Sequence, residues 1–346
     1  MTSNVAKNIA KRISAMGANK FVLFDCDTGS DDAIALMMLL TETAKKNVET
    51  VAITCVDGNT ALPNVVMNNL RLLKLFNMLD DVPVYRGCSE PLLPFSAHTG
   101  TGSIHGSDGM GGQPEYEPRS DPELLKHIQV KPAACAIVDL AKKYENNLTI
   151  VATGPLTNLA VALKLDPDLP SRVKNLYIMG GTREGTGNVT PAAEFNFYVD
   201  PEAAQITLMK FAPKCLTFIT DYGFCTKYSV PLQWIDDWLG KNDTTEKQGF
   251  ASMALQTLIK FYKDIYGKDS GLSICDAYTM STVLDTTIAW NPVIFDGFVE
   301  TGGVKSRGHL VLNKTGRKFE GFNGPLVFFD NYDVNKYKQM LKNSVA

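Results

Sequence analysis

The chain has 346 residues, of which 45% are hydrophobic and 21% are charged, the balance of a folded globular protein. This excludes a disordered, collagen-like or coiled-coil chain, and the length predicts one large α/β domain or two smaller ones. The formal net charge of −3 is spread along the chain without a basic block, which argues against nucleic acid as a partner.

Short apolar runs alternate with longer helical patterns over roughly the first two thirds of the chain. The runs predict strands at Lys20–Phe24, Thr50–Thr54, Val82–Tyr85, Leu148–Ala152, Leu176–Met179 and Leu216–Ile219. The longer patterns predict helices at Ala33–Leu40, Val65–Asn77, Pro132–Tyr144, Leu156–Leu165 and Pro201–Phe211. Because such alternation requires right-handed crossovers between parallel strands, it predicts a doubly wound, mostly parallel open sheet with flanking helices, as in Rossmann-like folds.

The pattern changes after Asp221. Helical patterns at Gln233–Gly240 and Phe250–Tyr266 predict a helical insertion around residues 230–270, and a further helix follows from Asp276. The remainder predicts two edge strands and a closing helix, at Val293–Glu300, His309–Asn313 and Val334–Lys342. No internal repeat or long linker divides the chain, so residues 1–346 are predicted to form a single domain.

The seven cysteines are scattered, odd in number and never arranged as CxxC, which argues against a disulfide framework or a structural zinc site. No apolar run approaches the roughly 20 residues of a membrane helix, and the first 20 residues lack the apolar core of a secretory signal. The sequence therefore predicts a reduced, cytoplasmic protein without a membrane partner.

The first predicted strand leads into Asp25-Cys26-Asp27-Thr28-Gly29-Ser30-Asp31-Asp32, with four carboxylates in eight residues. Open α/β sheets bind ligands at the carboxyl ends of their strands. Carboxylates that lie close together raise one another's pKa. A helix dipole stabilises each nearby carboxylate by only about 0.3–1 kcal/mol. A divalent cation such as Ca²⁺ or Mg²⁺ would offset more of the repulsion between these carboxylates. The alternative interpretation is that they cap the helix in a solvated acidic turn. An EF-hand is excluded because the twelfth position from Asp25 is Leu36.

Other predicted strand ends also carry polar residues. Asn59 follows the second strand, where it is a turn residue by default, and His105 lies in the glycine-dense stretch 100–112. That stretch fits either a surface loop or a lid bearing a polar contact. Thr153 follows the fourth strand, where its backbone carbonyl could face an ion.

The segment after the fifth strand, Gly187–Asn196, is the most unusual one. Its polar residues Asn188, Glu194 and Asn196 stand among small and apolar ones, and the last two would share one face of an extended segment. Carboxylate and amide groups suit a polyhydroxylated ligand, although turn-forming amides in a solvated loop are the alternative. Asp276 opens a later helix, as a cap or as a further oxygen ligand.

Together these segments resemble a known family, the nucleoside hydrolases often called inosine–uridine-preferring. The resemblance rests on DCDTGSDDAIAL, VDGN, IHG, TGPLTN, GNVTPAAEFNFYVDPEAA and Asp276, which follow in family order between residue 20 and about residue 290. It implies Ca²⁺-dependent hydrolysis of ribonucleosides to ribose and a free purine or pyrimidine base, in nucleoside salvage or catabolism. The family is typically dimeric or tetrameric, so the resemblance also implies a homo-oligomer.

The resemblance assigns roles to individual residues. Asp27, Asp32 and Asp276 would bind Ca²⁺ through carboxylates and Thr153 through its backbone oxygen, and Asp27 would also be the general base toward a Ca²⁺-bound water. His105 would lie near the base. The ribose hydroxyl groups would be held by Asp31, Asn59, Asn188, Glu194 and Asn196.

One position departs from the family pattern. Many members have His directly before the last calcium-binding Asp, where it helps to activate the leaving base, but this chain has Cys275. A thiol is mostly protonated at neutral pH yet is a weak hydrogen-bond donor. Tyr262 and Tyr266 lie where the family places aromatic residues over the base, where they could donate or stack, although aromatic residues four apart on a helix are also typical of a core.

Two alternatives remain at this point. Asp25-Cys26-Asp27 matches the DxD motif of a haloacid-dehalogenase-type, Mg²⁺-dependent phosphatase, but that family has Thr or Val where this chain has Gly29, and it gives no role to the segment 188–196. The second alternative is a non-catalytic protein that binds a nucleoside or ribose. Binding a neutral sugar, however, does not require an acidic cluster.

Overall fold

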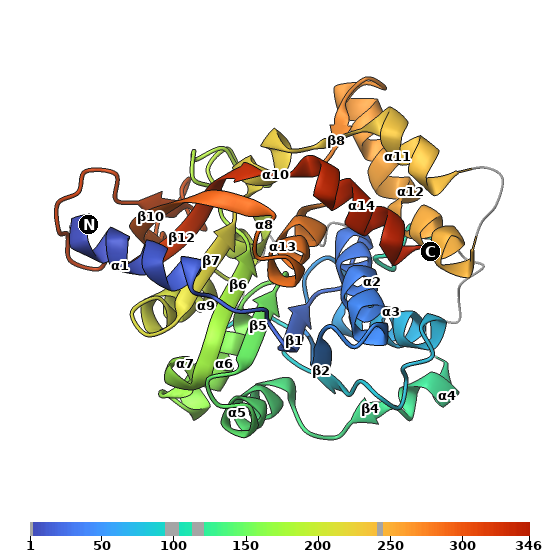
Figure 1. The fold of residues 1–346 in the computed structure, drawn as a ribbon, viewed down its shortest axis with the longest axis horizontal. Coiled ribbons are helices and arrows are strands. Elements are labelled where there is room, and N and C mark those ends of the chain that lie inside the picture. The colour runs from blue at the N-terminus through green and yellow to red at the C-terminus, as the bar shows by residue number, and fades with distance from the viewer. Residues whose placement is uncertain (1–2, 94–103, 113–120, 241–244) are drawn as a thin grey trace.

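The computed structural model describes residues 3–93, 104–112, 121–240 and 245–346, and a ten-stranded sheet forms its centre (Figure 1). The strands lie in the order β11-β10-β12-β7-β6-β5-β1-β2-β3-β4. All neighbours pair in parallel except β10, which is antiparallel to β11 and β12. The predicted doubly wound, mostly parallel sheet is therefore confirmed. The strands are β1 (Phe21–Cys26), β2 (Glu49–Cys55), β3 (Val84–Arg86), β4 (Ile128–Gln129), β5 (Leu148–Ala152), β6 (Val173–Met179), β7 (Leu216–Thr220), β10 (Ala289–Val299), β11 (Leu310–Leu312) and β12 (Asn323–Tyr332).

The strand order reverses next to β1. The chain runs outward from β1 through β2 and β3 to β4, and then returns to β5 on the other side of β1. Asp25 of β1 pairs with Ala152 of β5, and the N–H of Thr153 donates to the carbonyl of Asp25 at 2.9 Å. The segments that follow these strands therefore leave the sheet side by side, at the kind of switch point where α/β proteins bind ligands.

Helices cover both faces of the sheet and bury alternate residues of each strand. Val22 and Phe24 of β1 pack into one hydrophobic cluster, and Leu23 packs into the other. This alternation follows from the two-residue period of a strand. The first cluster includes the buried faces of α2 (Ser30–Ala44), α3 (Leu62–Leu75), α13 (Cys275–Leu284) and α14 (Val334–Ser344), and the second those of α5 (Ala133–Lys143), α6 (Thr157–Leu165) and α9 (Pro201–Phe211). The remaining short helices are α1 (Ser3–Ser14), α4 (Pro122–Leu125), α7 (Leu169–Arg172), α8 (Phe195–Val199) and α10 (Tyr222–Lys227).

The predicted helical insertion is present as α11 (Leu232–Leu239) and the long α12 (Glu246–Tyr266). A small antiparallel pair, β8 (Val230–Pro231) with β9 (Gly271–Leu272), closes its base. In Figure 1 these helices lie at the upper right of the molecule, beside α14 and on the side of α2. Within the described residues, none of the helices combines the length and the apolar character needed to cross a bilayer.

The end of the sheet differs from the prediction. The strand predicted at Val293–Glu300 is not an edge strand, because β10 lies between β11 and β12. The sequence analysis missed β12, whose buried run Leu326–Phe328 is short and directly follows Pro325. Proline removes a backbone donor and is uncommon inside a sheet, so this segment carries a weak strand signal. Its parallel pairing with β7 spans only Leu326 and Val327.

Candidate active site

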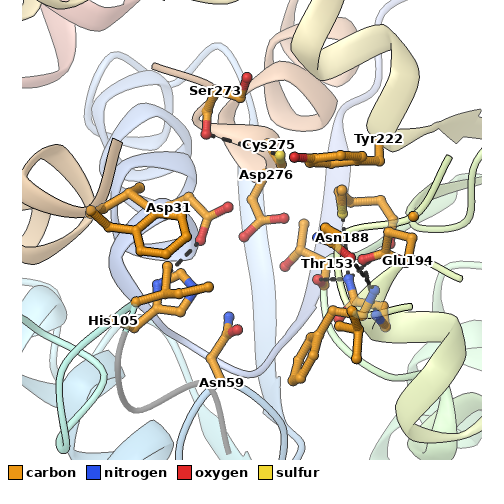
Figure 2. Close-up of a pocket in the computed structure, with 18 of the residues that line it drawn as sticks. Asp31, Asn59, His105, Thr153, Asn188, Glu194, Tyr222, Ser273, Cys275 and Asp276 are labelled. Carbon is orange, nitrogen blue, oxygen red and sulfur yellow. Dashed lines mark hydrogen bonds and ion pairs between the residues drawn. The ribbon is translucent and has the colours of Figure 1, made fainter. Parts of the chain in front are cut away.

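A cavity of about 230 Å³ lies at the carboxyl ends of the central strands, between the sheet and α12 (Figure 2). Most residues that the sequence predicted for the site line this cavity, although they come from segments spread over most of the chain. They are Asp31, Asn59, His105, Thr153, Asn188, Glu194, Asn196, Tyr262, Tyr266, Cys275 and Asp276. The two other predicted residues, Asp27 and Asp32, are fully buried behind this lining.

An acidic cluster forms where two helices begin. Asp31 and Asp32 lie in the first turn of α2 and Asp276 lies in the first turn of α13. One carboxylate oxygen of each lies within 4.8 Å of the others, close enough to hold one metal ion. Burial raises the pKa of Asp276, and the charges of Asp31, Asp32 and Asp27 raise it further. Two helix N-termini favour negative charge here, but their effect is too small to offset several buried carboxylates.

Asp32 is held by three donors. The hydroxyl of Thr153 donates to Oδ1 at 2.7 Å, and the side-chain amide of Asn59 and the N–H of Gly29 donate to Oδ2 at 3.1 and 2.9 Å. Burial nevertheless raises the pKa of Asp32 to about 6. These contacts fix the orientation of the carboxylate before any ligand binds.

Asp27 is fully buried, and one of its oxygens is unused. Its Oδ2 accepts the N–H of Asn59 at 2.7 Å, whereas its Oδ1 has no hydrogen-bond partner among the described residues. Burial and the neighbouring charge of Asp32 hold its pKa well above the usual range. Gly58 and Gly154 leave room for this side chain, because a Cβ on either would lie within 3 Å of its oxygens.

These residues fit a hard divalent cation. The donor set consists of carboxylate oxygens together with the Thr153 carbonyl, and it includes an unpartnered buried oxygen on Asp27. A cation would offset the mutual repulsion that raises the pKa values of Asp27, Asp32 and Asp276. Without such a positive charge, burying several carboxylates that repel one another would destabilise the folded protein.

By contrast, Asp25 points away from the cavity. Its Oδ1 accepts hydrogen bonds from the hydroxyl of Thr54 and the side-chain amide of Asn158, at 2.5 and 2.8 Å. Burial raises its pKa to about 6. Asp25 thus links β1 to β2 and to the start of α6.

The opposite wall of the cavity contains Asn188 and Glu194 (Figure 2). Asn196 also lines the cavity. Glu194 and Asn196 do not share one face of an extended segment as predicted, because Glu194 caps α8 and Asn196 lies inside that helix. The Glu194 carboxylate accepts the N–H groups of Asn196 and Phe197 and, at 2.8 Å, of Gly181. Burial raises its pKa to about 7 in spite of these donors. The side-chain amide of Asn196 donates to the Thr153 carbonyl at 2.7 Å and so links this wall to the acidic cluster.

His105 closes the cavity on the side of Asp31. Its Nδ1 accepts the N–H of Ser30 at 3.2 Å and lies 3.9 Å from Asp31 Oδ1. Burial lowers the pKa of His105 to about 4, so the ring is neutral at neutral pH. Residues 104–112 of the predicted glycine-dense stretch are held by Asn68 and Asp108, and the rest of the stretch lies outside the described residues. His105 is thus an ordered polar group at the cavity.

Aromatic and protic side chains form the remaining end of the cavity. Tyr262 and Tyr266 of α12 lie there beside Cys275, and their ring centroids are 5.4 Å apart. The sequence analysis missed Tyr222, which begins α10 directly after β7. The same strand-end rule that identified Asn59 and Thr153 would have identified it.

Comparisons with known proteins agree with this geometry. The family model described as inosine-uridine preferring nucleoside hydrolase matches residues 22–339. The pyrimidine-specific ribonucleoside hydrolase RihB of Escherichia coli (strain SE11) is 35% identical over 192 residues, and the match covers 56% of this chain and 57% of that protein. This chain thus spans a little over half the length of the curated relatives that it matches.

Two solved structures are similar over nearly their whole length. An inosine-guanosine nucleoside hydrolase is 27% identical with a TM-score of 0.83, covering 94% of this chain and 98% of that one. The plant nucleoside hydrolase PpNRh1 is 25% identical with a TM-score of 0.84, covering 95% and 99%. None of these matches is to a phosphatase. The family match spans nearly the whole sequence, and the chain therefore belongs to the inosine-uridine preferring nucleoside hydrolase family.

Proposed function

We propose that this protein hydrolyses the N-glycosidic bond of ribonucleosides, releasing ribose and a free base, and that it uses Ca²⁺. One observation carries the proposal: the acidic cluster of Asp31, Asp32 and Asp276 opens into the same cavity as Asn188, Glu194 and the other polar groups of the opposite wall. A phosphatase would not need that wall, and a simple sugar-binding protein would not need that cluster.

The ion would be held by Asp27, Asp32, Asp276 and the Thr153 carbonyl. When bound, Ca²⁺ would supply a positive charge that offsets the carboxylates and polarises hydroxyl and water oxygens. Asp31 lines the cavity, whereas Asp27 and Asp32 lie behind it. Asp31 is therefore better placed to reach a ribose hydroxyl group.

Asp27 is proposed as the general base that takes a proton from the attacking water. Its buried, unpartnered oxygen supports this role, because a base needs a free lone pair in a fixed position. Cleavage of a glycosidic bond passes through a transition state with positive charge on the sugar. The carboxylates of Glu194 and Asp31 would stabilise that charge at low cost, since protein contacts already orient them.

A panel of common ribonucleosides tests the proposal. Inosine, guanosine, adenosine, uridine and cytidine would be incubated with the protein and Ca²⁺, and reducing sugar would be measured. We expect hydrolysis of at least one, and weaker or no hydrolysis of the matching 2′-deoxynucleoside. Release of phosphate from p-nitrophenyl phosphate without ribose release would favour the phosphatase, and binding without turnover would favour a sugar-binding protein. The panel would also determine the base preference, since the relatives are named for different bases.

Replacing Cys275 with alanine is expected to lower kcat/KM by about 10-fold or less, because a weak neutral hydrogen bond contributes only about 0.5–1.5 kcal/mol. A hydrogen bond with Cys225, together with burial, holds the pKa of the Cys275 thiol well above its usual range. The thiol is thus a poor proton donor. Steady-state kinetics on the best nucleoside checks this, and a loss as large as that of Asp27→Ala would show that the thiol is essential.

Alanine at Gly58 is expected to disable the site, because its Cβ would lie 2.1 Å from Asp27 Oδ2. Overpacking of this kind costs about 1–3 kcal/mol, so both the melting temperature and nucleoside hydrolysis should fall. Gly17→Ala is the matched control, since a Cβ there meets no heavy atom of the described residues within 4 Å. If Gly58→Ala behaved like Gly17→Ala, Asp27 would not be confined as described.

A further inference from the structure

Tyr222 occupies a position in the cavity that the acidic cluster and the opposite wall do not explain. It is the first residue of α10, directly after β7, and it lines the cavity beside Cys275 (Figure 2). In Figure 2 its hydroxyl group points toward the Cys275 sulfur and into the space above Asp276. Tyr222 therefore lies at the end of the cavity that holds the protic and aromatic groups.

The backbone around Tyr222 is firmly held. Its N–H donates to the carbonyl of Gly181 at 3.0 Å, and the N–H of Gly181 donates to Glu194. Asp221, directly before it, accepts from the backbone and the side chain of Arg183, both at 3.0 Å. The same short backbone segment thus orients Tyr222 and Glu194, so the aromatic ring keeps a fixed position relative to the wall proposed for ribose.

The hydroxyl group of Tyr222 has a connection to solvent. Its electrostatic neighbours include the hydroxyl group of Tyr266, a residue that lines the same cavity and is 57% exposed. The Cys275 thiol instead points to the buried Ser273, whose carbonyl accepts from it at 4.0 Å. Tyr222 and the exposed Tyr266 thus lie at the same end of the cavity, where Tyr266 can exchange a proton with solvent.

Burial raises the pKa of Tyr222, and the neighbouring Cys275 raises it further. The phenol therefore stays protonated at neutral and mildly alkaline pH. A protonated phenol is a better hydrogen-bond donor than the Cys275 thiol.

We propose that Tyr222 donates to the departing base, and that Tyr266 returns the proton from solvent; this rests on the proposed function. As the bond between C1′ of the ribose and the base nitrogen breaks, its electron pair goes to the base. The Tyr222 proton moves toward the base, and the phenolate oxygen accepts a proton from the Tyr266 hydroxyl, which water replaces. Water adds to C1′, its proton goes to Asp27, and Asp27 then releases this proton to solvent, which balances the proton taken up at Tyr266. The products are ribose and a neutral base.

The test compares two leaving groups in the full-length protein with Ca²⁺. A nucleoside base needs a proton to leave, whereas p-nitrophenol leaves as a stable anion. We expect Tyr222→Phe to lower kcat/KM about 100-fold or more on the best nucleoside, as for loss of a general acid. On p-nitrophenyl β-D-ribofuranoside we expect a loss of about 3-fold or less.

Tyr228→Phe is the matched control, because it removes a hydroxyl group that donates to the Asp330 carbonyl outside the cavity. It should leave both substrates unaffected. Equal losses of Tyr222→Phe on both substrates, or an unchanged rate on the nucleoside, would overturn the assignment while leaving the proposed function in place. A wild-type protein that cleaved neither substrate would overturn the proposed function and this inference with it.

Discussion

Asp27→Ala is expected to lower kcat/KM for nucleoside hydrolysis by about 10³-fold or more, while the fold stays intact. The carboxylate is fully buried, its Oδ1 lacks a partner among the described residues, and its neighbours Asp32 and Asp276 share the proposed ion. The substitution therefore removes both the base and one ligand. Removing a buried like charge also relieves repulsion, so we expect no large fall in melting temperature without Ca²⁺. Steady-state kinetics and thermal unfolding measure the two effects.

Asp57→Asn is the matched control for Asp27→Ala. Asp57 lies at the adjacent strand end and accepts the N–H of Leu62 at 3.0 Å, a contact that an asparagine oxygen can keep. This control should retain activity within a few-fold of the wild type. Turnover by Asp27→Ala at the rate of Asp57→Asn would remove Asp27 from the mechanism.

Removing the ion is expected to lower both activity and thermal stability. A ligand that binds only the folded protein stabilises it by about 2.7 kcal/mol at 100 times its Kd, which corresponds to a few degrees in melting temperature. The buried carboxylates of Asp27, Asp32 and Asp276 supply the reason, since each has a raised pKa without a cation. We therefore expect prolonged treatment with EDTA to abolish most nucleoside hydrolysis and to lower the melting temperature.

Adding back Ca²⁺ should restore both properties, and Mg²⁺ in parallel tests which ion the site prefers. Elemental analysis of the treated protein must show that the metal is gone. An unchanged melting temperature in a protein shown to be free of metal would contradict the proposed cation site.

Much of the fold followed from local pattern. The strand Leu148–Ala152 and the helix Pro201–Phe211 have the predicted bounds, because each is an apolar segment whose period matches its structure. The strand-end rule then placed His105, Thr153 and Asp276 in one cavity, although they are far apart in sequence. This prediction depended on the topology, because the carboxyl ends of parallel strands lie at the same edge of the sheet.

The features that were mispredicted or missed depend on contacts between distant segments, which a local sequence pattern does not contain. Glu194 and Asn196 were predicted on an extended segment, but the carboxylate caps α8 by binding backbone N–H groups, including that of Gly181. Tyr222 is a single aromatic residue at the start of a helix, and its proposed role depends on its place in the cavity with Tyr266 of another helix. The short apolar run of β12 was missed because it directly follows Pro325, and its place in the sheet is set by pairing with β10 and β7.

The acidic cluster unites residues that lie far apart in the sequence, Asp31 and Asp32 with Asp276. During synthesis, a nascent chain that has not yet produced α13 lacks one third of these carboxylates and the helix that packs against α2. Affinity for the proposed ion would therefore arise only once α13 has been made and has packed against α2. Cation binding would then distinguish finished molecules from incomplete ones, so protection by calcium against proteolysis should be confined to chains that extend past this helix.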